Sequence, residues 1–154
     1  MAERKGFTLI EVLIVVLLVA TLTTIAIPTF QGVIFKVKFA QVLIDVNAME
    51  KSIDIDITEK GWEGIGVDFS EYIISAPQDF TYSIGAGMIL LTDPPLLISF
   101  DIVIRTSSDD EILCKRTINC DGARKWKINE SHPRSKYIEK LLPDAVPMPP
   151  IEIS

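Results

Sequence analysis

One acidic residue, Glu11, lies at the start of a strongly apolar segment and demands a chemical explanation. The stretch from Val12 to Ile27 contains no charged residue. An ionised carboxylate within an apolar membrane helix costs about 2.5–3.5 kcal/mol at the helix centre and less near an end. Such a residue is functional by default, so the carboxylate of Glu11 is expected to have a positively charged partner.

The segment around Glu11 is long enough to cross a membrane. Phe7 to Ile27 is 21 residues, which corresponds to roughly 31 Å of α-helix and covers the apolar core of a bilayer. Arg4 and Lys5 precede it, and positive charges of this kind predict that the N-terminus stays in the cytoplasm. The sequence therefore predicts a single-pass membrane segment followed by a head on the outer side.

Three interpretations of this segment compete. A secretory signal peptide would have a small-residue cleavage site, and none precedes Pro28. A plain membrane anchor fits the length but leaves Glu11 unexplained. If the chain is instead cut after Gly6, Phe7 gains a free amine, and the amine of a neighbouring subunit can pair with Glu11. A paired charge is tolerated in an apolar setting, so Glu11 would fix the axial offset between packed helices.

The run Gly6-Phe7-Thr8-Leu9-Ile10-Glu11 resembles the leader junction of bacterial type IV pilins and of the related pseudopilins of type II secretion. In that family the glutamate is the fifth residue after the cleaved glycine and a proline is the twenty-second, the positions of Glu11 and Pro28 here. The resemblance implies that a prepilin peptidase cleaves after Gly6 and that Phe7 becomes N-methylated. It also implies that Phe7, Glu11 and Pro28 serve assembly.

The resemblance predicts a structural subunit with no catalytic residue, cofactor or metal. Its partners would be membrane lipid before assembly, the prepilin peptidase, the inner-membrane pilus or secretion machinery, and other copies of the chain in a helical filament. It would occupy the inner membrane first and the cell surface afterwards. A minor pilin or a type II secretion or competence pseudopilin is the alternative, and a membrane-anchored binding module is a further one.

Composition and charge exclude several other classes. The chain has 154 residues and a net charge of −6, so it forms one ordinary domain and is not expected to bind nucleic acid directly. The short basic runs at 115–116 and 124–127 are interpreted as a solvated face. The spacing Asp54-x-Asp56 lacks the glycine and the final acid of a calcium loop. His132 is interpreted as a surface residue without catalytic partners.

Periodicity predicts an α+β fold, in which a long N-terminal helix, partly transmembrane, packs on a small antiparallel β-sheet head. The expected organisation is a leader at 1–6, a transmembrane or filament-core helix at 7–27, an amphipathic second half at 28–60 and a head at 61–154. Within the head, strands are predicted at 80–84 and 88–91 across a turn at 85–87, then at 96–104 and from 111 to 116.

The helix is expected to continue past Pro28, which should kink or locally melt it without ending it, and to stop at Lys60 before Gly61. One set of apolar residues recurs at helical spacing after Pro28, and it is expected to cover the sheet. Its first members are Phe30, Val33, Val37, Ala40 and Ile44.

Cys114 and Cys120 are predicted to form a disulfide. An outward-facing head lies in an oxidising compartment, which favours the bond. Such a small loop would contribute roughly 2–2.5 kcal/mol. Six extended residues span about 20 Å and a disulfide needs Cα atoms closer than about 7 Å, so the bond requires a turn between the two residues. Two unpaired thiols are the alternative.

Overall fold

The structure is a computed structural model that describes residues 6–62, 64–66, 68–90 and 96–149. It has the predicted α+β layout, with one long helix, α1 (Leu9–Lys60), followed by a five-stranded sheet. The chain forms two compact units, Met1–Phe35 and Lys36–Ser154, and α1 contributes to both.

Helix α1 begins and ends where local sequence features predict. Its last turn carries Lys60, and Gly61 follows with a φ of 73° while its N–H donates to Ile57 O at 2.8 Å. A left-handed glycine at this position caps a helix without steric cost. Residues 53–57, in which Ile alternates with Asp as in a strand, belong to this helix, as the expected end at Lys60 required. The helix also continues through residue 28, so the proline does not end it.

The sheet lies in the second unit and has the strand order β1-β2-β3-β4-β5. Its strands are β1 (Phe80–Leu90), β2 (Leu96–Thr106), β3 (Ile112–Asn119), β4 (Arg124–Ile128) and β5 (Val146–Pro147). An antiparallel sheet was predicted, and the first four strands form an antiparallel meander, in which β4 was not predicted; β5 pairs with β4 in parallel. The sheet is mixed because the chain passes through α2 (Ser135–Ile138) and a short 3-10 helix, η2 (Glu139–Leu141), before it returns beside β4.

The predicted turn at 85–87 is wrong, because β1 runs continuously through it. Gly85 pairs with Asp101, and the register shifts between Ala86 and Ile89. A Cβ atom added to Gly87 would lie 2.6 Å from Ser99 Oγ. Because Gly87 has no side chain, β2 can approach closely at this bulge, which is a common role of glycine within a strand. Residue 91, the end of the predicted strand, lies outside the described residues.

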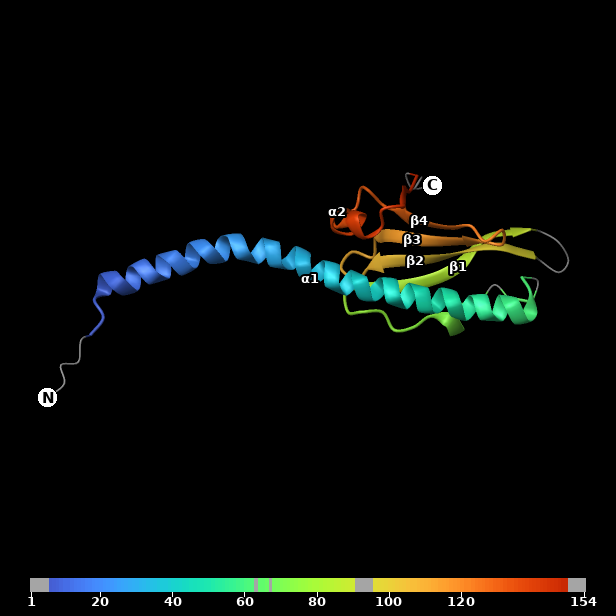
Figure 1. Cartoon of the computed structure of the whole chain (residues 1–154), viewed down its shortest axis with the longest axis horizontal. Helices are drawn as coiled ribbons and strands as arrows, with labels where there is room; N and C mark the ends of the chain where they lie inside the picture. The colour runs from blue at the N-terminus through green and yellow to red at the C-terminus, as the bar shows by residue number, and fades with distance from the viewer. Residues whose placement is uncertain (1–5, 63, 67, 91–95, 150–154) are drawn as a thin grey trace. The chain divides into compact units, whose positions relative to one another are not determined.

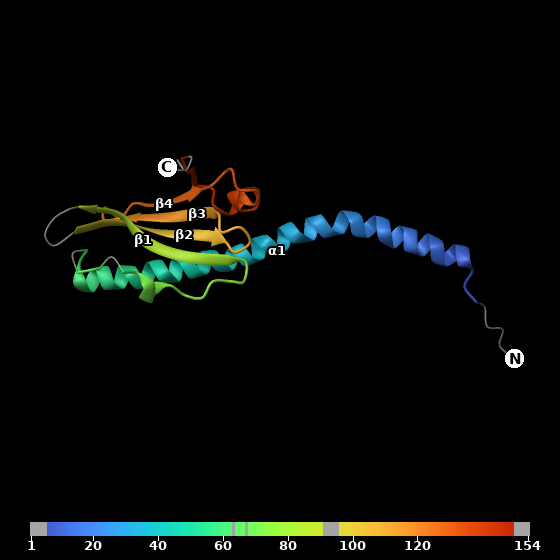
Figure 2. The same ribbon diagram turned by 180° about the vertical axis from the view of Figure 1, so that it is seen from behind.

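Within the second unit, α1 runs along one face of the sheet (Figure 1), as the view from behind confirms (Figure 2). The segment between α1 and β1 contains the 3-10 helix η1 (Ser70–Tyr72), and Phe69 beside it stacks on Phe100 with ring centroids 5.7 Å apart. Burying one large apolar side chain contributes about 1.5–3 kcal/mol, so the burial of these two rings stabilises the head. The core between α1 and the sheet is made by Phe39, Val42, Val46, Met49, Ile53, Phe100, Ile102 and Ile104.

The apolar set that was expected to cover the sheet also included the region 49–53, and it was only partly right: Met49 and Ile53 are buried, but the earlier members of the set are exposed. Val37 and Ile44 are 67% and 61% exposed, whereas Phe39 and Val42 are buried. Helix α1 therefore carries two apolar faces in the second unit, and only one of them packs on its own sheet. Periodicity alone could not choose between the two faces, because both have helical spacing.

Candidate assembly site at the start of the long helix

Thr8 and Glu11 form a reciprocal capping box at the N-terminus of α1. Glu11 Oε2 accepts hydrogen bonds from the N–H and the hydroxyl of Thr8, each at 2.8 Å. Thr8 Oγ1 in turn accepts from Glu11 N–H at 3.4 Å. This arrangement satisfies backbone donors that a helix start leaves unpaired, and it places the acid where the helix dipole favours negative charge.

Thr8 was missed as a site residue by the sequence analysis, although the spacing Thr-x-x-Glu before an apolar run is a recognisable capping signature. The box changes the expectation for Glu11, because one carboxylate oxygen is already satisfied within the subunit. Within the described part of the chain, the other oxygen, Oε1, makes no hydrogen bond. Glu11 can therefore hold its own helix start and still accept a further donor.

Gly6 and Phe7 lie just before the helix, and both are exposed; the Phe7 side chain is 86% exposed. In the uncut chain the nitrogen of Phe7 is an amide, so the structure does not bring a charged amine to Glu11. The capping box uses the N–H of Thr8, which remains an amide after a cut between Gly6 and Phe7. Processing at this bond would leave the box intact.

Behind the capping box, α1 presents apolar side chains on all sides. Among the described residues it is the one helix long and apolar enough to cross a membrane, with a mean hydropathy of 2.7 in its apolar window. The three hydroxyls within residues 12–27 are satisfied internally: Thr21, Thr23 and Thr24 donate to backbone carbonyls of the preceding turn at 2.6–2.9 Å. Satisfied donors of this kind are compatible with an apolar surrounding.

The predicted disulfide is absent, since Cys114 and Cys120 are both free. Strand β3 continues without a turn to Asn119, and Cys120 N–H extends the ladder by donating to Ile98 O at 2.9 Å. An extended chain holds the two residues about 20 Å apart, too far for a bond. Cys114 is buried, which raises the pKa of its thiol well above the ordinary value, while Cys120 is exposed.

His132 is buried, at 2% exposure, so its interpretation as a surface residue is wrong. Its Nδ1 accepts the N–H of Arg134 at 3.1 Å, which places the ring proton on Nε2, 3.1 Å from Thr106 Oγ1. Thr106 donates to Asp109, and this bond lowers the pKa of Asp109.

The chain Thr106–His132–Asp109 resembles a catalytic triad in composition only. Nε2 already carries the proton, so His132 cannot accept one from Thr106, and Thr106 is fully buried from any substrate. Asp109 and Glu111 lie near enough to His132 to share a metal ion, but the same proton occupies the nitrogen that would bind it. The cluster therefore ties the β2–β3 loop to the segment after β4.

The acidic residues that resemble part of a calcium loop are engaged with the head. Asp54 pairs with Arg124 at 2.5 Å, and Asp56 pairs with Lys60 at 3.0 Å. The Tyr72 hydroxyl donates to Asp56 at 2.5 Å, and this bond, followed by Lys60, lowers the pKa of Asp56. Charged and phenolic partners within the fold satisfy these carboxylates.

The family model described as "Prokaryotic N-terminal methylation motif" matches residues 1–27. Two curated proteins named "Fimbrial protein", both from Pseudomonas aeruginosa, are each 34% identical to this chain over 94 residues, which is 60% of this chain and 55% of theirs. The aligned region thus spans about half the length of these relatives. No solved structure matches the chain significantly. The N-terminal motif and these relatives together support a similarity of this chain to type IV pilins, and the methylation motif covers its first 27 residues.

Proposed function

We propose that the chain is the structural subunit of a type IV pilus-like filament. The precursor is inserted in the inner membrane with residues 1–6 in the cytoplasm, a prepilin peptidase cleaves it after Gly6, and Phe7 is methylated. Residues 7–27 then move from lipid into a bundle of identical helices, while residues 28–60 and 61–154 form the rest of the subunit. The methylation motif and the fimbrial relatives support this assignment.

The observation that carries the proposal is the half-satisfied carboxylate of Glu11. Lipid is as apolar as a helix bundle, so apolar contact alone gives little selectivity for assembly. With Oε2 held by Thr8, Glu11 Oε1 is oriented by its own helix start and accepts the methylated Phe7 amine of a neighbouring subunit. Such a pair stabilises one axial offset between helices, because any other offset leaves a charge unpaired in an apolar setting.

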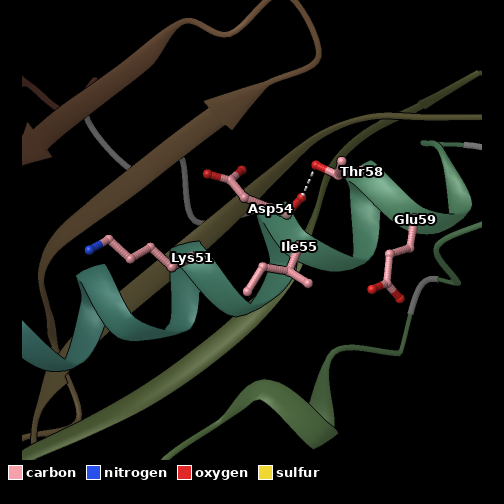
Figure 3. A pocket seen from close by; sticks show the side chains of 5 residues that line it. All are labelled: Lys51, Asp54, Ile55, Thr58 and Glu59. Atoms are coloured by element: carbon pink, nitrogen blue, oxygen red, sulfur yellow. Dashed lines mark hydrogen bonds between the residues drawn. The ribbon is translucent and has the colours of Figure 1, made fainter.

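Exposed apolar side chains beyond the membrane-length segment support the same proposal. Ile55 is 59% exposed on the outer side of α1, with Lys51 and Glu59 one turn to either side (Figure 3). Val37 and Ile44 are exposed on the same helix. A row of large aliphatic residues facing outwards is typical of a surface that another molecule covers.

The decisive experiment combines two measurements on the full chain expressed in cells with a type IV pilus assembly system. Mass spectrometry of the mature N-terminus should find a chain that begins at methylated Phe7, and sheared surface fibres should contain the chain. A chain that retains residues 1–6, or one trimmed near Thr24, would contradict the proposal. The number of copies per fibre distinguishes a main subunit from a minor pilin or pseudopilin.

Replacing Glu11 by Ala tests the pairing itself. The variant should reach the membrane at the normal level, because the apolar segment is unchanged, and should yield at least about tenfold fewer fibres, as expected when one partner of a desolvated charge pair is removed. Ile10→Ala, which shortens a neighbouring side chain without removing a charge, is the matched control. A normal fibre yield from Glu11→Ala would exclude the mechanism.

A further inference from the structure

The outer face of the sheet, opposite α1, carries a group of lysines that the fold brings together. Side chains alternate along a strand, so Arg116 and Trp126 face the helix side, whereas Lys115, Lys125 and Lys127 face outwards. In the register of β3 and β4, Lys115 lies directly opposite Lys127, and Lys125 lies opposite Thr117. We call Lys115, Lys125 and Lys127 the lysine patch.

The lysine patch is only partly neutralised within the subunit. Asp101 pairs with Lys115 at 2.9 Å and accepts the Thr117 hydroxyl at 2.5 Å. Lys125 and Lys127 have no ion-pair partner in the parts of the chain that the structure describes. The charge of Lys115 is offset by Asp101, so Lys125 and Lys127 give this face its net positive charge, which an acidic partner could neutralise.

An acidic surface lies at the C-terminal end of α1, on the other side of the sheet. Asp56 pairs with Lys60 at 3.0 Å, and Glu59 and Glu71 lie close to this pair; the hydrogen bond to Asp56 first, and then the three negative charges, raise the pKa of Lys60. Glu59 projects from the helix toward the segment that follows it (Figure 3). Three carboxylates around one ammonium leave a net negative charge. We call Asp56, Glu59 and Glu71 the acidic patch.

The two patches face away from each other, because the helix and the sheet lie between them. They cannot neutralise one another within one subunit, but they are complementary between two. A contact between different surfaces of identical subunits is heterologous, and it leaves a free patch at each end for the next copy. Complementary potentials also select register and partner more than they add affinity.

We propose that the lysine patch on the outer face of the sheet docks on the acidic patch of a second copy of this chain. The inference rests on the proposed filament function and adds a contact between heads to the Glu11 pairing at the helix start. The occupant is a second copy because the chain itself supplies the matching surface, and because a protein of net charge −6 repels nucleic acid over most of its surface.

A charge-swap experiment on the full chain, in cells that assemble it into fibres, tests this contact. Lys125→Glu with Lys127→Glu, and separately Glu59→Lys with Glu71→Lys, should each lower the yield of sheared fibres by at least about tenfold, because like charges then meet at the contact. The fourfold variant that carries all these changes should return to within about twofold of the native yield, since the pairs are restored in reverse.

The control variant, Lys136→Glu with Lys140→Glu, changes the net charge as much as the lysine variant does, on exposed lysines outside both patches. It should assemble normally, and all variants should reach native levels in the membrane. A fourfold variant as defective as its parents, or doubly substituted variants with normal yield, would overturn the inference while leaving the proposed function intact. Native fibres that lack the chain would overturn both.

Duplex DNA added to washed native fibres tests the alternative that the lysine patch binds nucleic acid. If the lysine patch is covered by a second copy, native fibres and fibres of the fourfold variant should bind equally little DNA. Salt-sensitive DNA binding that the native fibres show and the fourfold variant loses would mean that the lysines are free in the fibre, and would overturn the contact.

Discussion

Glu50 of α1 and Arg116 of β3 form an ion pair at 3.2 Å that joins the helix to the sheet across 66 residues of sequence. Arg124 of β4 also pairs with Glu50, and the guanidinium of Arg116 lies 5.2 Å from the centre of the Trp126 ring. Glu50 is only 7% exposed. Two arginines from the basic runs thus bind a buried carboxylate of α1, while the lysines beside them face outwards.

Replacing Glu50 by Gln should destabilise the head by about 3 kcal/mol, because it leaves the mostly buried Arg116 without its carboxylate, whereas Arg124 keeps Asp54. Thermal unfolding of the full chain in detergent micelles, followed by near-ultraviolet circular dichroism, measures the change. Glu139→Gln, at an exposed position, should stay within about 0.5 kcal/mol of the native chain. Equal stabilities for the two variants would contradict a structural role for Glu50.

Replacing Thr8 by Val should weaken the capping box, since it removes the hydroxyl and leaves the N–H that holds Glu11. The loss of an N-cap hydroxyl costs about 1 kcal/mol of helix stability, so we expect roughly a fivefold lower fibre yield at an unchanged membrane level. Thr8→Ser keeps the hydroxyl and should assemble normally. A normal yield from Thr8→Val would show that the box does not position Glu11 for assembly.

The two cysteines should react differently with a maleimide at pH 7.5. Cys120 is exposed and should be labelled in the folded chain, whereas Cys114 is buried and the raised pKa of its thiol keeps it protonated. Mass spectrometry should therefore find one label per native chain and two after denaturation, with or without prior reduction. If the two cysteines formed a disulfide, neither would be labelled without reduction, and both labels would appear only after reduction of the denatured chain.

Acid should destabilise the head partly through Asp56. Its pKa in the folded chain is lowered below the ordinary value of an aspartate, first by the Tyr72 hydroxyl and then by Lys60. A lowered folded pKa contributes stability that is fully present above the unfolded value and is lost as the pH falls through the folded pKa. The unfolding temperature should thus decline below about pH 4, and Tyr72→Phe should make that decline shallower. An identical decline in both chains would exclude this contribution.

The local features of the chain were predictable because neighbouring residues create them. The apolar segment, the acid at Glu11, the proline and the stop at Gly61 each act within a few residues, and the structure confirms the helix from Leu9 to Lys60. Strand β2 was likewise predicted from alternation, with Phe100, Ile102 and Ile104 on the buried face. Thr8 could have been included, since its capping signature is also local.

The sequence by itself therefore determined the long helix, its acidic start and the α+β layout. Only the tertiary structure decided which apolar face of the helix is buried, that Arg116 and Arg124 reach Glu50, and that Cys114 stays apart from Cys120. These outcomes depend on strand register and on contacts between residues far apart in the sequence. Register is fixed by the packing of a whole sheet against a helix, and a one-residue shift turns every side chain to the other face.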